Sequence, residues 1–247
     1  MNDTVLQVQG LCKNYPAFTL SEVSFSLEAG RIMGFIGRNG AGKTTTLKSI
    51  LGLVHPDAGE IRYFGLPFAQ NEQRIKEQIG YAAGGTSYYQ RRRVGEIARM
   101  TASFYPGWDD AAYRNYLRRF SLDESKCLRE LSEGMKVKFL LTLALSHHAK
   151  LLLLDEPTSG LDPVSRNELT ELLRRVVADG TRSVLFSTHI TSDLEKCATH
   201  IAFIKDGELQ YTGSLDDFRT HYKDVGATLE DIIVHVERRP LDEDAII

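Results

Sequence analysis

The segment GRNGAGKTT at residues 37–45 constrains the fold of this chain more than any other stretch. It fits G-x-x-x-x-G-K-[ST], the pattern of a phosphate-binding loop. The apolar run at 32–36 predicts a strand before the loop, and 44–53 predicts a helix after it. Because the pattern binds phosphate at a strand-to-helix turn, this context favours a nucleoside triphosphate site over an incidental glycine-rich turn.

The chemistry of the loop follows from its residue types. Glycines let the backbone approach a polyphosphate, and successive N–H groups then point inward at a helix N-terminus. We expect Lys43 to reach the β- and γ-phosphates as a catalytic group and Thr44 to bind Mg²⁺ through its hydroxyl. The residues expected to hold ATP here are Gly37, Asn39, Gly40, Gly42, Lys43, Thr44 and Thr45.

A second motif begins with four consecutive leucines at 151–154, followed by Asp155 and Glu156. A continuous apolar run of this length is typical of a buried strand in a parallel sheet, and such sheets bind ligands at the carboxyl ends of their strands. Mg²⁺ prefers oxygen ligands, so Asp155 is the expected metal ligand. Glu156 would then orient the attacking water near the γ-phosphate.

The octapeptide DEPTSGLD at 155–162 resembles the Walker B motif and D-loop of ATP-binding-cassette (ABC) proteins. Between the two Walker motifs, LSEGM at 131–135 stands where that family has its signature sequence. It departs from the commonest form, LSGGQ, at its third and fifth positions, but Ser132 and Gly134 are kept. The resemblance implies that Ser132 and Gly134 serve the ATP site of a second cassette, identical or related, arranged head to tail. It also makes Asp162, in the D-loop, a nucleotide-binding residue.

Two further positions are assigned by the same resemblance. His189 matches the switch histidine that contacts the γ-phosphate, although a histidine after a strand is often only a polar loop residue. Tyr15 matches the aromatic residue that stacks on adenine, although Tyr-Pro is also a common turn dipeptide.

One position departs from the family pattern. A glutamine normally follows a strand such as 79–81, where it senses Mg²⁺ and couples to the transport subunit, but this chain has AAGGT at 82–86. Either Gln90 reaches back through the glycines, or a backbone group or water replaces it. Gln90 precedes Arg91-Arg92-Arg93, which is either a solvated face or a contact patch for the permease or for anionic headgroups.

The order of predicted elements defines the fold class. Strands are predicted at 5–8, 23–27, 61–64, 79–83, 183–187 and 202–204, and helices at 94–104, 110–120, 134–146, 191–196 and from Pro163. The alternation of strands and helices predicts an α/β fold with a mostly parallel sheet and an inserted helical subdomain. The resemblance implies a P-loop NTPase that also has an N-terminal antiparallel β subdomain. The expected domains are the ATPase at 1–222 (core 1–83 and 147–222, helices about 84–146) and an extension at 223–247, frayed from Leu241.

Bulk composition limits the partners. The chain of 247 residues has a net charge of −3, without the basic excess of a nucleic-acid-binding protein. It has no apolar run of membrane-spanning length and no secretory signal, and its three scattered cysteines indicate a reducing compartment. We therefore expect a cytoplasmic protein, held at the inner face of the cell membrane by its partner.

The resemblance implies an ATPase subunit that powers a separate transmembrane permease, most similar to bacterial ABC-2-type exporters of drugs, peptides or other amphiphiles. One alternative is a cassette acting on nucleic acid or ribosomes, whose members typically carry paired cassettes or a coiled-coil insertion absent from this sequence. The other is a kinase or GTPase, but the sequence has no N-K-x-D guanine motif.

Overall fold

The computed structural model describes residues 4–83, 89–226 and 228–237. The expectation of a frayed tail from Leu241 and the positions 84–86 of the expected glutamine loop lie outside these residues.

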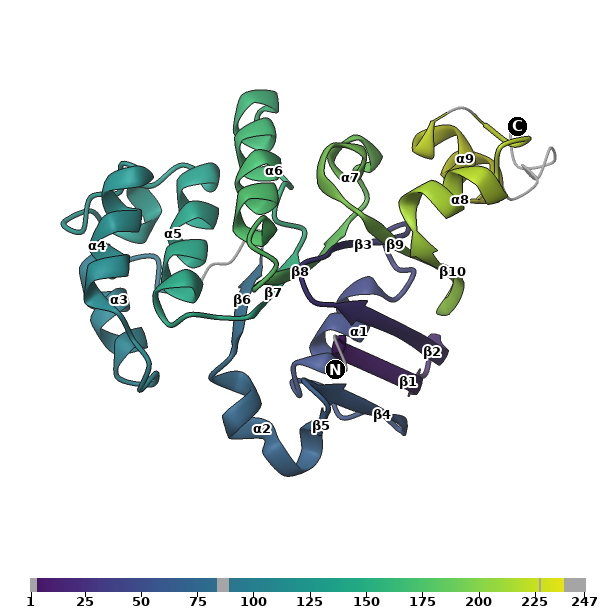
Figure 1. Ribbon diagram of the computed structural model, residues 1–247, viewed down its shortest axis with the longest axis horizontal. Coiled ribbons are helices and arrows are strands. Elements are labelled where there is room, and N and C mark those ends of the chain that lie inside the picture. The colour runs from purple at the N-terminus through teal and green to yellow at the C-terminus, as the bar shows by residue number, and fades with distance from the viewer. Residues whose placement is uncertain (1–3, 84–88, 227, 238–247) are drawn as a thin grey trace.

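A six-stranded sheet forms the centre of the molecule (Figure 1). Its strand order is β10-β9-β3-β8-β7-β6, and every pair is parallel except β9 with β10. The strands are β3 (Ile32–Ile36), β6 (Ile79–Ala83), β7 (Leu151–Asp155), β8 (Ser183–Thr188), β9 (His200–Lys205) and β10 (Glu208–Ser214). This confirms the mostly parallel α/β sheet predicted from the sequence.

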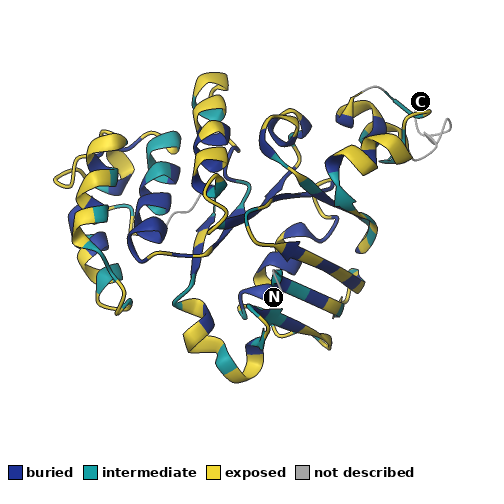
Figure 2. Cartoon of the chain, in the orientation of Figure 1, coloured by how far each residue is buried: buried dark blue, intermediate teal, exposed yellow. Residues whose placement is uncertain are grey.

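Helices cover both faces of this sheet, as its unbroken apolar strands require. Side chains alternate along β7, so Leu152 and Leu154 face one core and Leu151 and Leu153 face the other. The first core is closed by α5 (Glu133–Ser146), α6 (Pro163–Val177) and α7 (Thr191–Cys197), and the second by α1 (Lys43–Ile50). Figure 2 shows the buried strands between helices whose outer faces are exposed.

An antiparallel sheet of order β2-β1-β4-β5 packs against the α1 side. Its strands are β1 (Thr4–Tyr15), β2 (Phe18–Glu28), β4 (Ala58–Tyr63) and β5 (Leu66–Pro67), and α2 (Phe68–Lys76) follows. The sequence predicted only short parts of β1 and β2. Register shifts near Leu11 and a positive φ at Gly10 interrupt the alternation along β1, which hides its true length from a pattern search.

A helical lobe lies beside the sheet, next to edge strand β6 (Figure 1). It contains α3 (Val94–Ala102), α4 (Asp110–Arg119), the short 3₁₀ helix η1 (Leu128–Glu130) and α5, and it has its own core around Phe139. The predicted helices 94–104, 110–120 and 134–146 are therefore confirmed to within two residues. Asp109 caps α4 by accepting hydrogen bonds from the backbone N–H groups of Ala111 and Ala112.

The chain beyond β10 adds two helices that the sequence analysis did not predict, α8 (Leu215–His221) and α9 (Leu229–Glu237). The hairpin turn between β9 and β10, which precedes these helices, was predicted correctly: Asp206 and Gly207 both have positive φ there. Glu195 of α7 accepts hydrogen bonds from Arg219 of α8 and from the first N–H of α9. Within the described ranges, no helix has both the length and the apolar content needed to cross a bilayer.

The buried imidazole of His147 generates a prediction about pH. Burial lowers its pKa from 6.5 to about 4. In the unfolded chain it binds a proton below pH 6.5, whereas in the folded protein it stays neutral. Lowering the pH from 7.5 to 5 therefore reduces the free energy of unfolding, by about 1–2 kcal/mol from this group.

Urea unfolding at the two pH values measures this loss. His147→Phe keeps a ring against Tyr105, which stacks on His147 at 3.8 Å, but cannot titrate. We expect this variant to show a smaller loss than the wild type. Equal pH dependence in the wild type and His147→Phe contradicts the prediction.

Candidate functional site

The carboxyl ends of β3, β8 and β7 meet at one edge of the parallel sheet. The register pairs Ile36 with Thr188 and Asp155 with Ser187, so all three strands end at the same level. The phosphate loop follows β3, Glu156 follows β7 and His189 follows β8. Because β8 lies between β3 and β7, residues far apart in the sequence converge at this edge.

A groove of about 630 Å³ opens at this edge. It collects eight of the predicted site residues: Asn39, Gly40, Gly42, Lys43, Thr44, Thr45, Glu156 and His189. Four lining residues were missed by the sequence analysis: Ala17, Phe18, Arg38 and Ser159. Arg38 and Ser159 lie inside recognised motifs and could have been proposed from their position alone.

The backbone of the phosphate loop explains its glycines. Gly42 is the N-cap of α1 and has φ 114°, a value that disfavours any residue with a side chain. A Cβ on Gly37 would collide with the carbonyl oxygen of Ile204 on β9. The loop therefore packs directly on the sheet. It ends at the N-terminus of α1, where the helix dipole is positive.

Three ionisable side chains meet at the floor of the groove. The ammonium of buried Lys43 donates hydrogen bonds to the carbonyls of Gly37 (2.7 Å) and Arg38 (3.2 Å). It also lies 3.4 Å from Glu156 Oε1. The other carboxylate oxygen, Oε2, lies 2.9 Å from Nδ1 of His189. The cation, the carboxylate and the imidazole thus form one contiguous chain.

Glu156 has an unusual backbone. Its φ is 48°, in the left-handed region that costs a residue other than glycine about 1–2 kcal/mol. Two hydrogen bonds hold it there, because its N–H donates to both the carbonyl and the hydroxyl oxygen of Ser187, each at 3.1 Å. Strain of this kind concentrates at functional sites.

Asp155 lies one residue earlier and is outside the lining of the groove. Its Oδ1 accepts a 2.6 Å hydrogen bond from the hydroxyl of Ser187. Thr44 is exposed and lines the groove. A hydroxyl and a carboxylate are oxygen donors of the kind that Mg²⁺ binds together with phosphate and water, so the donor set fits this metal.

Ser132, Gly134 and Asp162 do not line the groove but lie close to one another. Ser132 caps α5 by accepting a hydrogen bond from Met135 N–H, and Asp162 caps α6 by accepting from Val164 and Ser165. A Cβ on Gly134 would lie 3.4 Å from the Ser165 side chain. The Ser165 hydroxyl is the main cause that lowers the pKa of Asp162. Two helix N-termini therefore adjoin in a second cluster.

Tyr15 is also outside the lining, whereas Ala17 and Phe18 of the same hairpin belong to it. Phe18 packs close to Gly42, since a Cβ there would lie 3.0 Å from its ring. Tyr15 is 40% exposed, with the Lys13 ammonium 5.9 Å from its ring centre.

Gln90 is held by its backbone, because its carbonyl accepts a hydrogen bond from Arg129 N–H. This contact does not decide whether the Gln90 side chain, a backbone group or water takes the place of the family's glutamine.

Comparison with known proteins adds independent findings. Residues 20–159 match the family model described as "ABC transporter". The chain is 32% identical to the ABC transporter ATP-binding protein YtrB of Bacillus subtilis (strain 168), covering 82% of this chain and 69% of that protein. It is also 32% identical to the bacitracin transport ATP-binding protein BcrA of Bacillus licheniformis, covering 83% and 68%.

A solved structure described as an ATP-binding subunit of an ABC transporter superposes with a TM-score of 0.84 at 31% identity. The match covers 95% of this chain and all of that one. The P-loop NTPase fold predicted from the sequence is therefore confirmed.

The loop glycines provide a test of this geometry. Gly37→Ala would introduce a clash with the rigid backbone of β9, whereas Gly40→Ala would point into open space and carry only the strain of φ 85°. We expect the free energy of unfolding to fall by about 2–3 kcal/mol for the first and about 1 kcal/mol for the second. Urea unfolding of both variants measures the difference. Equal losses contradict this packing of the loop on β9.

Proposed function

The chain belongs to the ABC transporter family of ATP-binding proteins, and from this membership we propose that it powers an exporter by closing against a second copy of itself around ATP. Its family binds and hydrolyses ATP to drive transport in partnership with a membrane permease. The chain is accordingly an ATPase subunit of an ABC transporter.

The contiguous contact of Lys43, Glu156 and His189 is the observation that carries the mechanism. We assign Lys43 and the loop N–H groups to the β- and γ-phosphates, where they stabilise the charge of the transferred group. Glu156 orients and polarises the attacking water. His189 holds the far oxygen of that carboxylate and contacts the γ-phosphate. Each role requires a group at the carboxyl edge of the sheet, where all three lie.

Thr44 and Asp155 are the proposed Mg²⁺ ligands. The metal, when bound, neutralises phosphate charge. Ser187 would keep Asp155 directed toward it, because the 2.6 Å hydrogen bond fixes one carboxylate oxygen. The same hydroxyl accepts from Glu156 N–H, so one side chain on β8 positions both the metal ligand and the water-orienting carboxylate.

Ser132, Gly134 and Asp162 are proposed to act on the ATP of the second copy. Their cluster presents the N-termini of α5 and α6, and a helix N-terminus binds anions through its N–H groups and dipole. Head-to-tail pairing would bring this cluster over the groove of the other chain. ATP binding would then favour the closed pair, and hydrolysis would release it.

Adenine is proposed to lie against the hairpin between β1 and β2. The resemblance favours Tyr15 as the stacking residue, and the groove lining adds Phe18 as a second aromatic surface beside the phosphate loop. Stacking needs only a π-face, so both rings are suitable.

An exporter is the proposed transporter type. The sequence resembles cassettes of bacterial ABC-2-type exporters, and BcrA is named for bacitracin transport. The substrate would be a drug, peptide or other amphiphile recognised by the permease. We place the assembly at the inner face of the cell membrane. A role on nucleic acid is not favoured, since the relatives are transport proteins and the chain carries a net charge of −3.

We propose the domain division expected from the sequence: an ATPase core at 1–83 and 147–222, a helical subdomain at about 84–146 and an extension at 223–247. The separate core around Phe139 supports an independent helical unit. Docking of α9 on Glu195 supports an extension anchored to α7, the helix that follows His189.

Glu156→Gln tests the assignment of the water-orienting carboxylate. The amide keeps the shape of the side chain but cannot polarise water as a carboxylate does, so we expect ATP binding to persist and steady-state turnover to fall by about 100-fold or more. Glu168→Gln, an exposed carboxylate on α6 paired with Lys138, is a matched control with expected normal turnover. Near-normal ATPase activity of purified Glu156→Gln rules out this role.

A further inference from the structure

An exposed strip of basic residues remains outside the ATPase machinery. The loop that precedes α3 lies beside the segment that contains η1, and backbone hydrogen bonds join them. Leu128 N–H donates to the Arg92 carbonyl, and Arg129 N–H donates to the Gln90 carbonyl, both at 3.0 Å. Val94 N–H donates to the backbone carbonyl of Lys126 at 2.9 Å. This pairing joins two cationic segments into one surface, here called the basic ridge: Arg91, Arg92, Arg93, Lys126 and Arg129.

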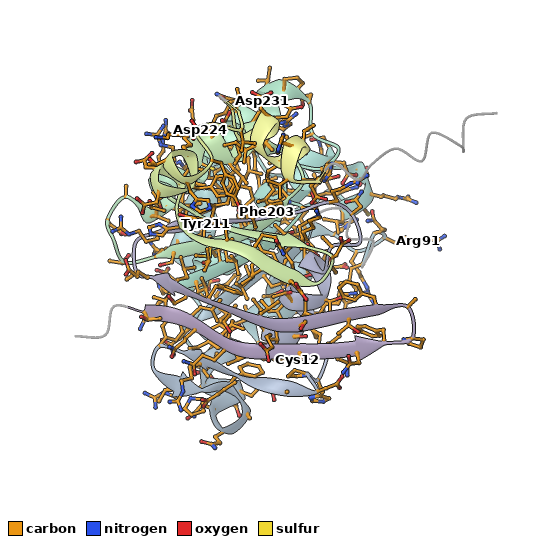
Figure 3. The ribbon with its side chains drawn as sticks, turned by 90° about the vertical axis from the view of Figure 1, so that its right-hand side faces the viewer. Cys12, Arg91, Phe203, Tyr211, Asp224 and Asp231 are labelled. Carbon is orange, nitrogen blue, oxygen red and sulfur yellow. The ribbon has the colours of Figure 1, made fainter. Side chains whose placement is uncertain are left out.

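All five cations of the basic ridge are exposed. In the described part of the chain, the ion pair found for the ridge is the 3.7 Å contact of Arg92 with Glu96, which is itself exposed and therefore weak. The ridge thus offers guanidinium and ammonium groups to an outside partner. Figure 3 shows Arg91 at the margin of the molecule, extending away from the body.

Four carboxylates lie near the ridge, and each already accepts a hydrogen bond. Glu124 accepts from the Tyr113 hydroxyl at 3.1 Å. Glu96 accepts from Arg93 N–H, Glu130 from Cys127 N–H and Asp123 from Ser125 N–H. Five cations against these four anions leave a local excess of one positive charge on a chain whose net charge is −3. The charge of the ridge is therefore opposite in sign to that of the whole protein.

An aromatic residue accompanies this charge. Tyr89, next to the ridge, is 55% exposed, and it lines an apolar pocket of about 280 Å³ together with Met100, Val137 and Leu140. None of the five cations belongs to the lining of that pocket. They lie beside the pocket and face outward, which suits a broad charged surface better than a ligand enclosed by the pocket.

We propose that the basic ridge binds the anionic headgroups of a lipid bilayer, with Tyr89 at the membrane interface. Basic residues near an anionic bilayer contribute additively to binding, and tyrosine is favoured at the boundary between headgroups and acyl chains. The assumption that the ridge lies near a membrane rests on the proposed function. Binding to vesicles, however, requires neither ATP turnover nor a permease. The two proposals can therefore fail separately.

Cosedimentation of the full chain with vesicles tests the ridge. One set contains phosphatidylcholine alone, and the other contains phosphatidylcholine with 30% phosphatidylglycerol. We expect binding to the anionic vesicles only, weakened by high salt. The triple variant Arg91→Gln, Arg92→Gln, Arg93→Gln should lose on the order of 10- to 100-fold in affinity. Its ATPase activity and urea unfolding, measured alongside, should match the wild type.

A second triple variant is the matched control: Arg114→Gln, Arg118→Gln, Arg119→Gln. It removes the same charge from exposed positions on α4, and we expect it to bind nearly as well as the wild type. Absence of binding to anionic vesicles overturns the proposal, as does an equal loss in both triple variants, which would show only an effect of net charge. Loss of copurification with a membrane protein without any vesicle binding would instead assign the ridge to the permease.

Discussion

The parallel alignment of β3, β8 and β7 is the constraint on which the site depends. Parallel strands in register end at the same level. The phosphate loop, Glu156 and His189, which follow these strands, therefore lie at one edge of the sheet. The register is held by the apolar side chains of these strands, because slipping one strand by one residue would move its leucines to the opposite core. Packing of the core and placement of the chemistry are therefore the same property of this fold.

Ser187 shows how closely structure and chemistry are joined. It lies on β8, directly opposite Asp155, and its hydroxyl contacts both that carboxylate and the N–H of Glu156. The left-handed φ of Glu156 is thus stabilised by the neighbouring strand. A carboxylate fixed in this way can meet Lys43 on one side and His189 on the other.

Much of this could be predicted from the sequence, because the decisive signals are local. The glycine spacing of the phosphate loop, the leucine run before Asp155 and the helical periods of the lobe each depend on a few neighbouring residues. The full length of β1 was missed because bulges near Leu11 break its alternation. Phe18 was missed because its place in the groove depends on how the β1–β2 hairpin folds over Gly42, a long-range contact that no local pattern encodes.

The central claim is that each ATP site is shared between two copies of the chain, with the groove from one and the Ser132 cluster from the other. Mixing two inactive variants tests this most directly. Lys43→Ala disables the groove of its own chain, and Ser132→Arg disables the cluster that its chain offers. We predict that each variant alone is inactive and that an equal mixture recovers about a quarter of the wild-type ATPase rate, since half of randomly formed pairs contain one intact site of two. A mixture as inactive as its components would contradict the account.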